Sequence, residues 1–69
     1  MKLDLHGIKH GDVGKELDSF LYEQFKTNNL QIEIITGKST AMKNIVKDLL
    51  IEYGLEVGQE LEGSLIIDL

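Results

Sequence analysis

The sequence contains no cysteine, so neither a disulfide scaffold nor a cysteine-ligated metal site can be built from it. It contains no proline, which excludes a proline-rich linker and a cis-proline turn. No apolar run approaches the ~20 residues that span a bilayer, and the start Met1–Asp4 has none of the features of a signal peptide. We therefore expect a cytoplasmic protein with no membrane partner, complete as one domain over residues 1–69, because a chain of 69 residues holds a single small core.

Arginine, the side chain best suited to bidentate phosphate contacts, is also absent. Twelve acidic residues outnumber seven lysines, and the formal net charge is −5. A surface of that charge repels nucleic acid as a whole, so any binding of DNA or RNA has to depend on a local site. The composition, 42% hydrophobic and 28% charged, is that of a folded protein and not of a disordered one.

Hydrophobic periodicity predicts four strands and two helices in the order β-α-β-α-β-β. The expected strands are residues 2–6, 30–36, 55–59 and 64–69. The first helix is expected to begin between residues 9 and 12 and to end near 27, and the second to run from about 40 to 53. Their apolar stripes are Val13, Leu17, Phe20, Leu21 and Phe25 in the first, and Met42, Ile45, Val46, Leu49, Leu50 and Tyr53 in the second.

The distribution of apolar residues over the strands predicts how the helices and the sheet are layered. One face of each expected strand is apolar and the other is mostly polar, so both helices should cover the same face. The predicted fold class is therefore α/β, in the form of an α+β two-layer sandwich with a four-stranded mixed sheet. Right-handed crossovers with both helices on one side make the first three strands step across the sheet in the same direction. The fourth strand, with its apolar run Leu65–Ile67, is expected to be antiparallel and central, which gives the strand order 1-2-4-3.

The end of the first expected strand carries a candidate catalytic pair. Asp4 and His6 are two residues apart, so their side chains share one face of the strand. A carboxylate at this spacing can orient an imidazole for general acid or base catalysis or for phosphate binding. Gly7, which follows, is a candidate ligand-binding residue. The alternative interpretation is a polar pair on a solvent-facing sheet surface.

The junction between the second expected strand and the second helix is a candidate anion site. It consists of Thr36, Gly37, Lys38, Ser39 and Thr40. Unpaired backbone N–H groups and the positive helix end favour an anion there, and Lys38 adds a charge. The alternative is an ordinary turn that Gly37 allows and that Ser39 or Thr40 caps. Because ligands bind beyond the carboxyl ends of parallel strands, this turn should lie beside the segment that contains His6.

Spacing argues against two more specific sites. A nucleotide-binding P-loop requires a glycine five residues before Gly37, and Ile32 stands there. His10 follows His6 by four residues, but Gly7 interrupts the helix that would align the two as zinc ligands. We therefore expect no cofactor and no resident metal, and the sequence contains no ligand cluster for the divalent ion that a nuclease could use.

Several segments together carry a family pattern. They are Leu-Asp-Leu-His-Gly at 3–7, Leu-Asp-Ser-Phe-Leu at 17–21, Ile-Ile-Thr-Gly-Lys at 34–38, and Lys43, Val46 and Leu50 in the second helix. With them the sequence resembles the small MutS-related (Smr) domain over nearly its whole length. The resemblance implies the fold of the C-terminal domain of translation initiation factor three, which agrees with the order predicted from periodicity. The Asp and His of the family's first motif match Asp4 and His6.

The resemblance also implies binding to DNA or RNA, often with endonuclease or nicking activity. The family's second motif usually reads His-Gly-x-Gly, whereas here Thr36 and Ser39 stand at two of its positions. Whether the chain is an enzyme therefore stays open. If it nicks nucleic acid, His6 is the expected general acid or base, and Lys38 the group that stabilises charge on the phosphoryl oxygens.

Two other classes of function compete with nucleic-acid binding. The first is a non-catalytic module that binds a protein partner or a second copy of the chain through the open sheet face around Ile35 and Ile66 or through an outer strand. The second is a small-molecule enzyme that binds a phosphate or carboxylate at the same strand–helix junction.

Overall fold

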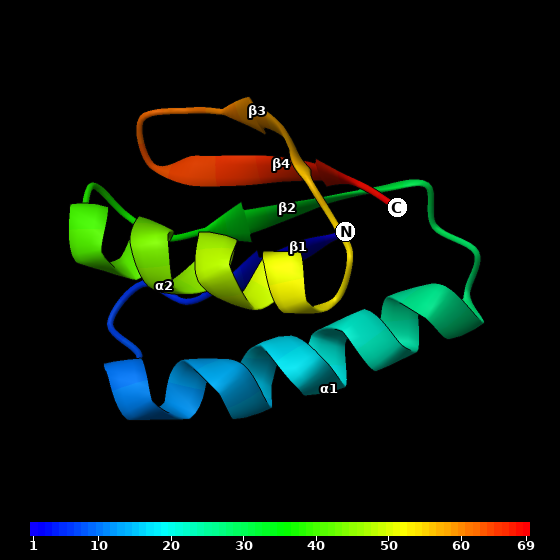
Figure 1. Cartoon of the computed structure of the whole chain (residues 1–69), viewed down its shortest axis with the longest axis horizontal. Helices are drawn as coiled ribbons and strands as arrows, with labels where there is room; N and C mark the ends of the chain where they lie inside the picture. The colour runs from blue at the N-terminus through cyan, green and yellow to red at the C-terminus, as the bar shows by residue number, and fades with distance from the viewer.

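The computed structural model describes residues 1–69 as a four-stranded sheet with two helices packed on one of its faces (Figure 1). The elements are β1 (Lys2–Asp4), the 3₁₀ turn η1 (His10–Asp12), α1 (Val13–Lys26), β2 (Gln31–Ile35), α2 (Thr40–Glu52), β3 (Val57–Glu60) and β4 (Ser64–Asp68). The predicted order of strands and helices is confirmed, with η1 as an addition at the start of α1. Neither helix combines the length and the apolar character needed to cross a bilayer.

The sheet has the strand order β1-β2-β4-β3. β1 is parallel to β2, whereas β4 is antiparallel to both of its neighbours, so the sheet is mixed. Leu3 pairs with Ile34, and Ile34 pairs with Leu65, so one apolar face continues from strand to strand. The predicted two-layer α+β sandwich, including its strand order, is confirmed (Figure 1).

The core lies between this apolar sheet face and the inner faces of the two helices. Eleven apolar side chains are buried in it: Leu5, Val13, Leu17, Leu21, Ile32, Ile34, Met42, Val46, Leu50, Leu65 and Ile67. Each helix contributes three of them, and β2 and β4 contribute two each, whereas β3 contributes none. The more apolar of the last two strands therefore occupies the central position, where both of its neighbours shield it from water.

The first helix departs from its predicted stripe near its C-terminal end. Phe25, which was expected in the core, is 51% exposed, and Gln24 is buried instead. Leu17 and Leu21 are four residues apart, so the period of 3.6 brings residue 24 onto their line and turns residue 25 outward. The amide of Asn29 donates a hydrogen bond to the side-chain oxygen of Gln24, which satisfies this buried polar group.

The first strand is shorter than predicted. β1 ends at Asp4 and not at His6, because the chain turns at Gly7, whose φ of +83° favours glycine. Pairing with β2 nevertheless continues for one more residue, because the N–H of Leu5 donates to the carbonyl oxygen of Ile35 at 2.8 Å. His6 therefore leaves the sheet directly beside the end of β2.

The third strand begins later than predicted. The N–H of Leu55 donates to the carbonyl oxygen of Leu50 at 2.9 Å, so residue 55 still caps the C-terminal end of α2 and is not yet part of a strand. Gly54, with a φ of +75°, allows this closing turn. The other boundaries agree with the prediction to within about one residue.

Replacement of Leu65 by alanine tests the central position of β4. Leu65 is fully buried, so Leu65→Ala is expected to lower the free energy of unfolding by about 2–5 kcal/mol. Leu30→Ala, at a side chain that is 79% exposed, is the control and should change stability by less than about 0.5 kcal/mol. Urea unfolding followed by circular dichroism measures both. Equal midpoints for the two variants would contradict this placement of the core.

Candidate functional site

The turn after β1 and the turn after β2 are in contact. Gly37 has a φ of +71°, and a Cβ added to it would lie 3.2 Å from Cδ2 of His6. The edge of the imidazole therefore packs against residue 37, and with a side chain there the ring would have to move by a few tenths of an ångström. The two segments that were expected to be neighbours lie side by side, because they follow adjacent parallel strands.

A third segment, the turn between β3 and β4, completes the same end of the molecule (Figure 1). The carbonyl oxygen of Gly63 accepts hydrogen bonds from the backbone N–H groups of Thr36 and Gly37, both at 3.0 Å. This turn was not predicted to be part of the site. The signal for it was the central, antiparallel placement of the fourth strand, which brings the start of β4 to the end of β2.

The carboxylate of Asp4 binds the backbone of His6 and not its imidazole. Its Oδ1 accepts a hydrogen bond from the N–H of His6 at 2.9 Å, and no hydrogen bond joins the carboxylate to the imidazole. Both side chains are exposed. The carboxylate thus holds the main chain at the point where it leaves the sheet, and Gly7 then completes the turn with its positive φ. Asp4 positions His6 through the main chain.

Thr36 and Ser39 use their hydroxyl groups within the protein. Thr36 is buried, and its Oγ1 donates to the carbonyl oxygen of Gly37 at 2.9 Å. The Oγ of Ser39 accepts the N–H of Met42 at 3.1 Å, which makes Ser39 the N-cap of α2. The hydroxyl of Thr36 therefore stabilises the turn through the backbone of Gly37. The hydroxyl of Ser39 fixes the start of the helix.

The first turn of α2 retains free hydrogen-bond donors. The backbone N–H groups of Thr40 and Ala41 donate to no group of the protein, and both residues are exposed. They point along the helix axis, out of the positive end of the helix dipole. Of these two, only Thr40 was predicted as a site residue, whereas Ala41 was missed because its contribution is purely backbone.

Lysines at this end of the molecule are paired with carboxylates of the β3–β4 hairpin. Lys38 Nζ lies 3.1 Å from Oε1 of Glu62, and both side chains are exposed. The Nζ of Lys43, which is only 13% exposed, donates to the carbonyl oxygens of Leu61 at 2.9 Å and Glu62 at 2.7 Å. The hydrogen bond from Lys47, together with its charge, lowers the pKa of Glu60 from its ordinary value. The site is therefore not a strongly positive patch.

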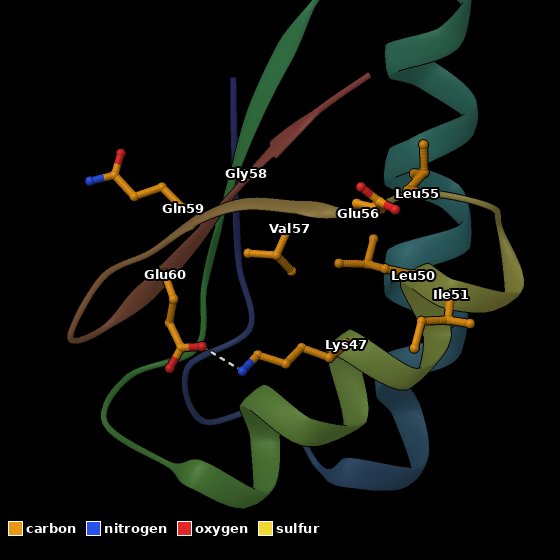
Figure 2. A pocket seen from close by; sticks show the side chains of 9 residues that line it. All are labelled: Lys47, Leu50, Ile51, Leu55, Glu56, Val57, Gly58, Gln59 and Glu60. Atoms are coloured by element: carbon orange, nitrogen blue, oxygen red, sulfur yellow. Dashed lines mark ion pairs between the residues drawn. The ribbon is translucent and has the colours of Figure 1, made fainter.

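The surface around His6 is open and not hollowed. A groove of about 440 Å³ lies between α2 and β3 (Figure 2), and three smaller hollows lie elsewhere. The residues lining the groove are Lys47, Leu50, Ile51, Leu55, Glu56, Val57, Gly58, Gln59 and Glu60. Neither His6 nor any residue of the turn 36–40 lines any of the four hollows. No group of three His, Cys, Asp or Glu side chains gathers to hold a metal ion.

Comparisons with known proteins identify the family. Residues 3–60 match the model of the Smr domain family. The matched span runs from within β1 to the end of β3 and leaves out β4. The crystal structure of the human small-MutS related domain superposes with a TM-score of 0.79 at 27% sequence identity, over 100% of this chain and 100% of that one. No curated protein matches the sequence significantly. On the family match and the shared fold, the chain belongs to the Smr domain family.

Proposed function

We propose that this chain binds nucleic acid at the end of the sheet where His6 meets Gly37, with a backbone phosphate against the first turn of α2. Smr domains are generally nucleic-acid-binding modules. The observation that carries the proposal is the packing of the imidazole edge on the backbone of residue 37. This contact brings the imidazole to the turn that leads into α2, which begins three residues later at Thr40.

The donors at this end suit a phosphodiester. The N–H groups of Thr40 and Ala41 are unpaired and exposed, and a helix N-terminus favours an anion. Lys38 is the exposed cation on the same turn. Because the chain carries a net charge of −5, these few groups and not the general surface have to attract the ligand.

The open shape of the site favours a chain-like ligand over a small molecule. Small-molecule sites are concave and enclose most of their ligand. None of the four hollows of this structure is lined by His6 or by the turn 36–40. A nucleic-acid strand, which is held by its backbone along a surface, fits that shape better than a metabolite does.

Nicking is the activity that the same arrangement would support. His6 would move a proton at the scissile phosphodiester as the general acid or base, and Lys38 would stabilise the charge that develops on the phosphoryl oxygens. Asp4 would keep the imidazole in place through the hydrogen bond to its backbone N–H. Thr36 stands where the family's motif usually has histidine, which leaves His6 as the imidazole that contacts this turn.

Binding of labelled DNA and RNA oligonucleotides tests the interface. We expect His6→Ala and Lys38→Ala to weaken binding, and Lys38→Ala to reduce the slope of log K against log salt by about 1, because one phosphate contact is lost. Lys26→Ala, at the opposite end of α1, removes the same charge and should have a much smaller effect. Unchanged binding by both site variants would refute the assigned roles. A wild-type protein that binds no oligonucleotide but sediments with a protein partner or as a dimer would favour the interaction module.

Relaxation of supercoiled DNA and cleavage of RNA test the nicking activity. His6→Ala is expected to lower the cleavage rate by about 10²–10⁴-fold, which is the usual contribution of a general acid or base. His10→Ala is the matched control, because His10 lies in η1 and is exposed. Cleavage that persists in His6→Ala and is lost in His10→Ala would contradict the assignment.

Two glycine variants separate the backbone strain from the contact with His6. Gly37 and Gly54 have nearly the same φ, +71° and +75°, so alanine at either position should cost about 1–2 kcal/mol of stability. Only at Gly37 would the new Cβ meet the imidazole, since nothing lies within 4 Å of a Cβ at Gly54. We therefore expect weaker nucleic-acid binding in Gly37→Ala alone. Equal binding by the two variants would show that the packing of His6 is irrelevant.

A further inference from the structure

We infer that Glu62, in the turn between β3 and β4, is a built-in competitor for the ligand's phosphate at Lys38. The inference rests on the proposed nucleic-acid binding and deepens it. Oε1 of Glu62 lies 3.1 Å from Nζ of Lys38. The ammonium group that a phosphate would approach is therefore already paired with a carboxylate. The carboxylate is part of the same chain, so it is present at every encounter with a ligand.

The backbone of this turn is held in place from two sides. Lys43, whose side chain is mostly buried, donates from Nζ to the carbonyl oxygens of Leu61 and Glu62. On the other side, the carbonyl oxygen of Gly63 accepts the N–H groups of Thr36 and Gly37. The main chain on either side of Glu62 is thereby attached to α2 and to the candidate phosphate-binding turn. The position of the Glu62 backbone relative to the turn that carries Lys38 thus follows from the fold.

Glu60, the neighbouring carboxylate of the hairpin, has a different role. Glu60 pairs with Lys47 and lies 3.8 Å from Nζ of Lys43, so its charge is compensated within the protein. Glu62 pairs only with Lys38, and both of these side chains are about 80% exposed. The Lys38–Glu62 pair can therefore open without exposing a buried charge, and a phosphate can replace the carboxylate.

Competition of this kind lowers the affinity of the site for every anion that has to reach Lys38. A single weak anion has to displace Glu62 for one contact, whereas a strand of phosphates gains further contacts along the turn and the helix end. An exposed ion pair contributes only a small free energy, so removal of the carboxylate should tighten binding by about two- to five-fold. Glu62 is in this sense a residue that sets the affinity of the site, although it touches no ligand.

The test compares two variants that remove the same charge. Glu62→Gln and Glu52→Gln each add one unit to the net charge, but Glu52 is the last residue of α2, roughly 20 Å along the helix from its start. At ~0.1 M salt the Debye length is about 10 Å, so the distant charge is largely screened. Fluorescence anisotropy with a labelled single-stranded oligonucleotide gives the two dissociation constants, and thermal unfolding checks that both variants keep the fold.

We expect Glu62→Gln to bind about two- to five-fold more tightly than Glu52→Gln, and this gain to disappear when Lys38→Ala is present in both variants. Equal binding by the two single variants, with measurable binding by the wild type, would overturn the competitor role and leave the proposed function intact. A gain that persists with Lys38→Ala would overturn it as well, because the carboxylate would then act elsewhere. If neither the wild type nor any variant binds the oligonucleotide, the inference and the proposed function fail together.

Discussion

The parallel pairing of β1 with β2 is the constraint on which the candidate site depends. It continues past the end of β1 through the hydrogen bond from Leu5 to Ile35, and the chain leaves both strands at one edge of the sheet. The apolar face determines the register, because a slip of one residue would turn the core side chains Leu5 and Ile34 toward water. Packing of the core, and not any contact within the site, therefore brings His6 to the turn that follows β2.

The fold follows from the periodicity of apolar residues to a large extent. Strand alternation, two helical stripes and one polar sheet face are enough to give a two-layer sandwich, and the apolar character of β4 places it in the centre. Prediction of the buried side chains fails where either of two neighbouring helix residues could face the core. Phe25 is the more apolar, but Gln24 lies on the buried line of the helix and has a partner for its side chain. Sequence alone does not show such a partner.

The candidate site was predictable in its location and only partly in its chemistry. Two conspicuous motifs at the ends of adjacent parallel strands must lie close together, and this much needs only the strand order. The partner of each polar group depends on the conformation of the turn. Asp4 binds a backbone N–H, Thr36 is buried, and the carboxylate of Glu62 reaches Lys38 from the β3–β4 hairpin. None of these pairings follows from spacing along the chain.

The central claim is that one surface, formed by His6 and the first turn of α2, meets the ligand of this acidic protein. Titration of the ¹⁵N-labelled protein with an oligonucleotide, followed by two-dimensional NMR, tests it residue by residue. We expect the largest shifts at His6 and at the amide groups of Gly37–Ala41, because a phosphate bound there would change their hydrogen bonding. Shifts that concentrate instead on the groove between α2 and β3, or on the open face of the sheet, would contradict the account.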